Sequence, residues 1–145
     1  MMMEVKNKKA YFNYFVEDQI ESGIVLTGTE IKSVRKSAIN ITDSYIRIKS
    51  GEAFIINMHI AKYENGNIFN HEEDRERKLL LHKKEIRKLH EKISQDSYTL
   101  IPLSVYMKQN KAKVLIGICK GKKTFDKRQS IKEKDIIKSN YQRVS

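Results

Sequence analysis

The sequence has little of what disulfide-bonded or membrane-spanning proteins need. A single cysteine, Cys119, in 145 residues excludes an internal disulfide and a cysteine-based zinc site. It is typical of a reducing cytoplasm. No apolar run approaches the ~18 residues of a transmembrane helix, and no apolar segment follows the first charges as it does in a secretory signal. We therefore expect a soluble, cytoplasmic protein.

Catalytic motifs are also missing. The histidines do not have the HExxH spacing of a metal site, and we interpret all four as packed or solvated side chains: His59, His71, His82 and His90. Gly121 precedes two lysines, but Ile116 stands where a phosphate-binding loop needs its first glycine. Cys119 lies in an apolar segment, which favours a structural thiol. We expect no enzymatic activity and no cofactor.

One acidic cluster needs a separate interpretation. Glu72, Glu73 and Asp74 could form a metal site, but Arg75 and Arg77 follow directly. Acidic residues are favourable in the first turn of a helix. We interpret the cluster as the start of a basic helix.

Positive charge is abundant and is concentrated near the end of the chain. The net charge is +11, and the residues from Lys108 onward include 12 Lys or Arg against 3 Asp or Glu. The first 107 residues are nearly balanced, with 17 basic and 15 acidic side chains. This distribution indicates a folded domain that presents a basic arm to a polyanion. A membrane surface or calmodulin is the rival partner, but the arm lacks the apolar face that lipid insertion requires. We rank nucleic acid above both.

The first 60 residues are predicted to be mainly β. Residues 1–9 are expected to be loose at their beginning. Residues 10–26 favour two strands around a turn at Ser22–Gly23, with a helical turn in YFVEDQIE as the alternative. Thr27 and Glu30 have the spacing of a capping box and predict a short helix with Ile31, Val34 and Ala38 on one face.

Residues 44–60 are predicted to form a hairpin. Ile46 and Ile48 alternate with basic residues, and Ser50–Gly51 provides the turn. The second strand is expected to continue this alternation through four apolar residues, Phe54, Ile56, Met58 and Ile60.

The second half is predicted to contain a loop, a helix and two strands. Residues 61–74 are typical of a loop, and residues 75–94 of a basic helix. The apolar stripe of that helix comprises Leu79, Ile86, Leu89 and Ile93. Residues 98–107 favour a strand in which Pro102 marks an edge or a bulge. Residues 111–119 favour another strand, after a turn at Gln109–Asn110.

These elements predict one domain and a tail. Five or six mostly antiparallel strands with two inserted helices indicate an α+β protein, mainly β, built on a small antiparallel barrel of the OB type. We assign residues 1–123 to the barrel and residues 124–145 to a basic tail. Ser130 and Glu133 could cap a helix there, but an isolated helix of ~12 residues is marginal in water. We expect the tail to be disordered when free and to fold on a charged partner. Twenty residues would reach ~65 Å when extended or ~30 Å as a helix.

Five stretches, in order, resemble the small protein B family of SsrA-binding proteins: NKKAYFNYF, GIVLTGTEIKS, DSYIRIKSGEAF, RKLLLHKKEI and GKKTFDKRQSIKEKD. The resemblance implies an OB-fold barrel that binds the tRNA-like domain of transfer-messenger RNA (tmRNA, or SsrA RNA). It implies that the alanyl-charged RNA is delivered to stalled ribosomes with GTP-bound elongation factor Tu. The tail would enter the empty messenger channel and the decoding centre during trans-translation. A generic OB-fold module for single-stranded nucleic acid is the alternative.

The resemblance also implies site residues. Asn7, Lys8, Glu30 and Lys113 match positions that the family uses for RNA binding. For Glu30, capping its helix, holding a basic side chain and accepting from a base all remain open. Lys122 and Lys123 continue a run of six lysines, from Lys108 onward, that lacks any carboxylate, and each lysine could neutralise a phosphate.

In the tail, the resemblance implies a ribosome-facing set of residues: Phe125, Asp126, Lys127, Arg128, Ile131, Lys132, Lys134 and Lys138. The chain departs from the family at Phe12, where many members have histidine, and at Phe125, where tyrosine or histidine is commoner. Phenylalanine keeps the ability to stack on a base but loses the hydrogen bond.

Overall fold

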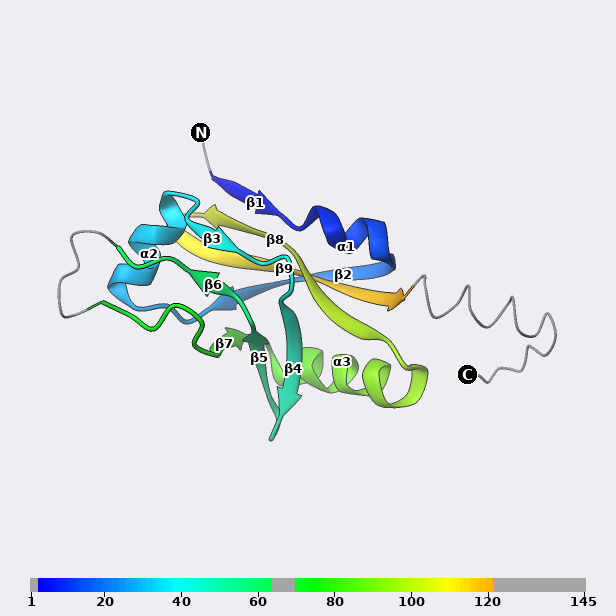
Figure 1. Cartoon of the computed structure of the whole chain (residues 1–145). Helices are drawn as coiled ribbons and strands as arrows, with labels where there is room; N and C mark the ends of the chain where they lie inside the picture. The colour runs from blue at the N-terminus through cyan, green and yellow to red at the C-terminus, as the bar shows by residue number, and fades with distance from the viewer. Residues whose placement is uncertain (1–2, 64–69, 122–145) are drawn as a thin grey trace.

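The computed structural model describes residues 3–63 and 70–121, which form nine strands and three helices (Figure 1). The predictions for Lys122, for Lys123 and for residues 124–145 lie outside the described residues. The predicted boundary between domain and tail is therefore untested.

Seven of these strands form one antiparallel sheet in the order β1-β8-β9-β2-β7-β5-β4. Their bounds are β1 (Glu4–Lys6), β8 (Thr99–Lys108), β9 (Lys111–Gly121), β2 (Tyr14–Ile24), β7 (Arg77–Leu80), β5 (Glu52–Ile56) and β4 (Tyr45–Lys49). Two short strands, β3 (Ile39–Asn40) and β6 (His59–Ile60), form a separate pair. The edge strand β4 packs beside β8, so the sheet curls toward a closed barrel. The predicted mainly-β, OB-type architecture is confirmed.

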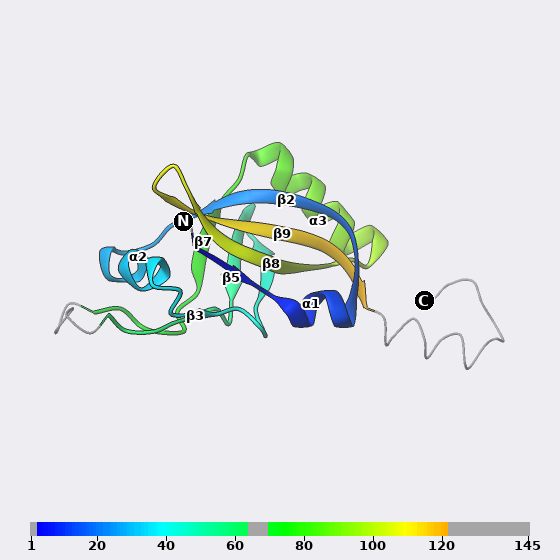
Figure 2. The same ribbon diagram turned by 90° about the horizontal axis from the view of Figure 1, so that it is seen from above.

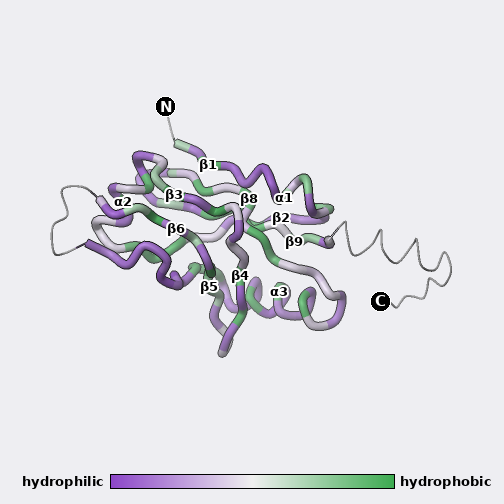
Figure 3. Tube along the Cα trace, in the orientation of Figure 1, coloured by the Kyte–Doolittle hydropathy of each residue, from purple (hydrophilic) through white to green (hydrophobic). Residues whose placement is uncertain are grey.

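Three helices flank the sheet: α1 (Lys8–Asn13), α2 (Gly28–Arg35) and α3 (Lys83–Asp96). α2 lies at one end of the barrel, and α1 and α3 lie toward the other (Figures 1 and 2). α2 begins at the predicted capping box, in which the Thr27 hydroxyl accepts from the Glu30 amide (3.3 Å) and the Glu30 carboxylate accepts from the Thr27 amide (2.9 Å). In α3, Ile86 and Leu89 are buried. Polar and apolar residues alternate along this helix (Figure 3).

Two of the three predicted turns between strands are confirmed. Ser50 and Gly51 have positive φ angles of 53° and 75°, and Gln109 and Asn110 have 52° and 64°. Two successive residues with positive φ form the turn whose twist matches that of the flanking strands. Pro102 lies at a bulge, where the pairing of β8 with β9 shifts register. Because β8 has β1 on its other side, the alternative of an edge position is wrong.

The predicted turn at Ser22–Gly23 is wrong, because β2 is continuous through both residues. Gly23 lies opposite Lys113 of β9 and Leu80 of β7. A Cβ atom there would come within 3.3 Å of the Leu80 side chain, so the glycine allows close packing rather than a reversal. The helical alternative for YFVEDQIE is also wrong, since β2 contains these residues and α1 precedes them.

The predicted helix over residues 75–94 combines two elements. Residues 77–80 form β7, in which buried and exposed residues alternate, and α3 begins only at Lys83. The Glu85 carboxylate accepts from the His82 amide (2.8 Å) and so fixes the start of α3. Leu79 is buried, but it packs from a strand and not from the helix stripe.

The second strand of the first hairpin has the opposite phase to the one predicted. Ala53 and Ile55 are fully buried, whereas Phe54 and Ile56 are half-buried. Asn57 has a positive φ of 62°, which ends the alternation. Met58 and Ile60 therefore reach the core from a separate segment.

The core limits what the remaining side chains can do. A Cβ atom on Gly117 would lie 2.8 Å from the Leu103 side chain, so the centre of the sheet admits no larger residue there. Cys119 is fully buried, and burial raises the pKa of its thiol to about 11. The reactive thiolate is therefore scarce at neutral pH. Within the described ranges, no helix has the length and apolar character to cross a membrane.

Candidate nucleic-acid interface

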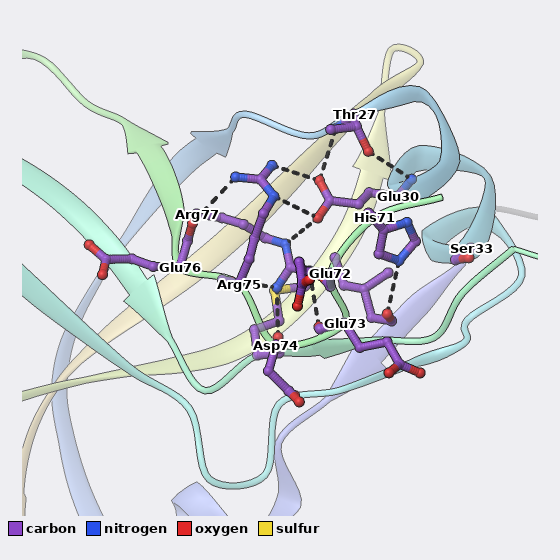
Figure 4. Close-up of polar contacts among 12 residues, drawn as sticks. Thr27, Glu30, Ser33, His71, Glu72, Glu73, Asp74, Arg75, Glu76 and Arg77 are labelled. Carbon is purple, nitrogen blue, oxygen red and sulfur yellow. Dashed lines mark hydrogen bonds and ion pairs between the residues drawn. The ribbon is translucent and has the colours of Figure 1, made fainter. Parts of the chain in front are cut away.

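Glu30 lies in a buried network with two arginines (Figure 4). The side chains of Glu30 and Arg77 are both 0% exposed. Arg77 Nε donates to Glu30 Oε2 at 2.7 Å. Arg75 donates from Nε to Oε2 (3.1 Å) and from Nη2 to Oε1 (2.8 Å). The carboxylate thus both caps α2 and holds basic side chains in place. With no exposed surface in this conformation, it does not meet a base directly.

Arg77 ties this network to the chain segment that precedes β7. Its remaining N–H groups donate to backbone carbonyls at 2.6–3.1 Å, those of Met58, Glu72, Glu73 and Arg75. The acidic cluster therefore lies in a loop that passes around a guanidinium, and the predicted helix start there is wrong. Among residues 3–63 and 70–121, no group of acidic, histidine or cysteine side chains could hold a metal ion.

Burial opposes both charges of the pair. Desolvation lowers the pKa of Arg77 and, acting alone, would raise that of Glu30. Hydrogen bonds from Arg75, the Thr27 amide and Arg77 outweigh that effect and hold the pKa of Glu30 below its ordinary value of 4.5. Glu30 is therefore a carboxylate at neutral pH.

Asn7 is also buried, with 2% of its surface exposed. Its amide nitrogen donates to the carbonyls of Ile41 (3.1 Å) and Pro102 (3.0 Å). Its amide oxygen caps α1 by accepting from Ala10 N (3.2 Å). Asn7 thus holds α1 against β8 and leaves the exposed Lys8 as the surface residue of this pair.

We expect Asn7→Ala to lower the free energy of unfolding by about 1–3 kcal/mol, because it leaves buried carbonyls without donors. Thermal unfolding measures the change. Asn40→Ala is the matched control, since the Asn40 amide oxygen accepts from Thr42 N (2.9 Å) at an exposed site. A similar loss in both variants would contradict a structural role for the buried amide. Asn7→Asp keeps the cap but turns a carboxylate oxygen toward the two carbonyls at a buried site, so it should destabilise the fold at least as much as Asn7→Ala.

Lys113 lies on an outward-facing row that crosses four strands. The row runs from Tyr106 of β8 through Lys113 and Gly23 to Leu80 of β7. Leu80 is 54% exposed, although large apolar side chains are usually buried. We call Tyr106, Lys113, Gly23 and Leu80 the Lys113 row.

Glu21 organises one end of this row. It accepts a hydrogen bond from Tyr106 Oη and pairs with Lys108 Nζ at 3.5 Å. Burial and the bond to Glu21 raise the pKa of Tyr106 to about 12, and the Tyr106 bond lowers the pKa of Glu21. Sequence reasoning missed Glu21, Tyr106 and Leu80. The alternation of buried and exposed residues along β7 places Leu80 on the outward face, but Glu21 lies on β2 and Tyr106 on β8, and no local pattern marked them.

Among the described residues that were predicted to bind RNA, Asn7, Glu30 and Lys113 do not lie in one cluster. The backbone N–H of Asn7 donates to the carbonyl of Leu103 in β8 (2.8 Å). Lys113 lies opposite Tyr106, which is also in β8. The two positions are thus separated along β8 by three residues, or about 10 Å. Glu30 lies apart from both, inside the α2 network.

Comparison with known proteins identifies the family. A family model described as SmpB protein matches residues 4–145. The chain belongs to the SmpB family. This confirms the resemblance found in the sequence.

Individual SmpB-family relatives match over most of the chain. An SsrA-binding protein of Shouchella clausii (strain KSM-K16) is 56% identical over 130 residues, which cover 90% of this chain and 83% of the relative. One from Clostridium beijerinckii is 57% identical over 129 residues, 89% of this chain and 83% of the relative. A chain in the solved structure "tmRNA-SmpB: a journey to the center of the bacterial ribosome" aligns with a TM-score of 0.70 and 39% identity, covering 88% of this chain and 94% of that one.

Proposed function

We propose that this chain binds the tRNA-like domain of tmRNA and brings it to stalled ribosomes for trans-translation. The observation that carries this proposal is the match to the SmpB family over residues 4–145. The alignment to a chain from a tmRNA-SmpB structure over 88% of the length supports it. The site of action would be the cytoplasm, and the protein would act by binding, without catalysing a reaction.

Two basic residues at the surface of the barrel, the exposed Lys8 and the half-buried Lys113, are suited to contact the RNA. Lys8 at α1 and Lys113 in the row on β9 can each neutralise a phosphate, and the exposed Leu80 offers an apolar surface beside them. Asn7 and Glu30 act through the fold: Asn7 positions α1, and Glu30 positions α2 and the loop before β7. Both are positioning residues.

The end of the chain supplies the ribosome contact in this proposal. Lys122 and Lys123 extend the basic run toward the RNA. The tail set from Phe125 to Lys138 enters the messenger channel and reaches the decoding centre. The complex delivered there is alanyl-charged tmRNA with GTP-bound elongation factor Tu. The support for this division is the charge of the tail and the family motif GKKTFDKRQSIKEKD.

A binding competition tests the RNA partner. We expect the chain to prefer tRNA-like-domain RNA over unstructured RNA of equal length at ~0.15 M salt, where phosphate contacts alone do not distinguish the two. Lys113→Gln should weaken binding, whereas Lys49→Gln, at an exposed lysine that pairs with Glu76 (3.0 Å), should not. Equal binding of the two RNAs would contradict the proposal and favour a generic single-strand module.

A further inference from the structure

Tyr98 joins three other parts of the chain at the end of the barrel where β9 stops. Its hydroxyl donates to Glu17 Oε1 of β2 at 2.6 Å. The ammonium groups of Lys92, in α3, and of Lys120, in β9, lie 5.3 Å and 4.8 Å from the centroid of its ring. We call Tyr98, Glu17, Lys92 and Lys120 the Tyr98 cluster. Its members are distant in sequence, so only the folded barrel brings them together.

The backbone holds Tyr98 in a fixed place. Ser97 caps the end of α3 with a positive φ of 60°. A left-handed residue at a helix end lets the chain turn back on the last carbonyls, and the Tyr98 amide donates to the Lys92 carbonyl at 3.1 Å. β8 begins at the next residue, Thr99. The half-buried ring packs against the barrel core, so it can anchor the side chains around it.

A bulge in β2 brings Glu17 to Tyr98. Consecutive residues of β9 pair with Val16 and with Asp18, so Glu17 is the extra residue at this point of the strand. Bulges re-aim a side chain that regular pairing would hold elsewhere. The hydrogen bond to Glu17, together with burial, raises the pKa of Tyr98 to about 12. The hydroxyl is therefore a donor at neutral pH.

Lys120 is the member of the cluster that lies next to the tail. It pairs with Phe15 near the end of β9, and the last residue of that strand, Gly121, pairs with Tyr14. The end of a strand opens at little cost in free energy. If residues 120 and 121 leave the sheet, the fixed point from which the chain continues moves back by about 7 Å. A lysine attracted to the face of an anchored aromatic ring opposes this opening.

We propose that Tyr98 is a positioning residue that clamps the end of β9 and so fixes the point from which the tail leaves the barrel. This inference rests on the proposed function, in which the tail enters the messenger channel while the barrel holds the RNA. A clamped tail starts from one place relative to the bound RNA. An opened strand end adds backbone freedom that must be lost again on entry. Tyr98 therefore serves tagging and not RNA affinity.

Hydrogen exchange tests the clamp in the full-length chain without any ligand. In Tyr98→Leu, leucine keeps an apolar contact with the core but supplies neither a ring for the lysines nor a donor for Glu17. We expect the amides of residues 119–121 to exchange about five- to tenfold faster, while those at the centre of β9, such as Ile116, exchange as in the wild type. Lys120→Gln should act in the same direction. The double variant should exceed neither single variant, because both changes remove one contact.

Tyr63→Leu is the matched control for these exchange rates. Two lysines of α2, Lys32 and Lys36, lie 5.3 Å and 5.1 Å from the centroid of the Tyr63 ring, but α2 lies at the other end of the barrel (Figure 1). This variant should leave exchange at residues 119–121 unchanged. A similar increase in Tyr63→Leu, no increase in Tyr98→Leu, or additive effects of the Tyr98 and Lys120 changes would each overturn the inference.

Tagging and RNA binding separate a positioning role from a merely structural one. With a reporter message that lacks a stop codon, tagging by Tyr98→Leu should fall about five- to tenfold, in proportion to the opening of the strand end. Its affinity for tRNA-like-domain RNA should stay within about twofold of the wild type, because the phosphate contacts of the barrel remain. Parallel losses of tagging and RNA affinity would assign Tyr98 to the stability of the whole barrel and overturn the inference.

The wild-type protein separates the two possible failures. If it supports tagging and Tyr98→Leu tags equally well, the inference fails and the proposed function stands. If wild-type protein supports no tagging, the proposed function itself fails, and the exchange rates alone decide whether Tyr98 clamps the end of β9.

Discussion

Glu30→Ala is expected to lower the free energy of unfolding by about 3–5 kcal/mol, because it leaves a buried guanidinium without its carboxylate. Arg77 is fully buried, and its Nε lies 2.7 Å from Glu30. Arg75, itself a cation, cannot replace that partner. The α2 cap is lost as well, since the Thr27 amide donates to the same carboxylate. Urea unfolding followed by circular dichroism measures the change.

Glu52→Ala is the matched control for burial. Glu52 also pairs with a basic side chain, Lys78, at 3.1 Å, but both side chains are nearly half exposed. Exposed pairs contribute less than about 1 kcal/mol. Equal losses in the two variants would contradict the structural role assigned to Glu30.

The contribution of Glu30 has a defined pH dependence. Its pKa in the folded chain lies below the ordinary 4.5, so the unfolded state binds the proton more tightly. The stabilisation is therefore complete above about pH 4.5 and is lost as the pH falls through the folded-state pKa. The difference in stability between wild type and Glu30→Gln should accordingly be largest near neutral pH and shrink toward pH 3. A difference that grows in acid would show that the sign is wrong.

A chain that ends at Lys123 is expected to lose tagging on stalled ribosomes while it keeps its affinity for tRNA-like-domain RNA within about threefold, because the phosphate contacts of the barrel remain. The deletion removes every residue proposed to enter the messenger channel, from Phe125 to Lys138. A reporter translated from a message without a stop codon measures tagging, and a salt titration measures RNA binding. We expect tagging to fall to background.

Two variants refine this test. Full-length protein with Asp126, Lys127 and Arg128 changed to alanine keeps the length of the tail and should still lose most tagging. Changing Lys49, which pairs with Glu76, to glutamine removes a charge from the barrel and should leave tagging intact. If the truncated chain no longer binds tRNA-like-domain RNA, the proposed division between barrel and tail is wrong.

Features set by neighbouring residues were predictable from the sequence. The capping box of Thr27 and Glu30, the turn at Gln109–Asn110 and the bulge at Pro102 all follow from one or two residues and their local hydrogen bonds. In each case the backbone conformation depends little on the rest of the chain.

Features set by distant packing were not predictable. Gly23 looked like a turn residue because its actual role, making room for Leu80, depends on a strand more than fifty residues away. Leu79 matched the helical stripe by spacing, but the strand β7 that holds it is completed by pairing with β2 and β5. Tertiary pairing overrode the local pattern in both cases.

For the candidate site, too, the sequence indicated some features and the tertiary structure was needed for others. The resemblance identified Asn7, Lys8, Glu30 and Lys113 as positions, but burial assigned their roles. Asn7 and Glu30 are enclosed, and Lys8 and Lys113 reach the surface. Glu21 and Tyr106 could not be paired from the sequence, because 85 residues separate them.

The position of β9 also affects how the protein is synthesised. This strand is the last of the sheet in sequence, yet it lies between β8 and β2 and pairs Gly121 with Tyr14. A nascent chain cut short before residue 111 has no such strand, and it exposes the unpaired edges of β2 and β8, which are templates for aggregation. Folding must wait for the ribosome to deliver β9 and must then close a long loop, which makes it slow. An incomplete copy of the chain would therefore be prone to aggregate.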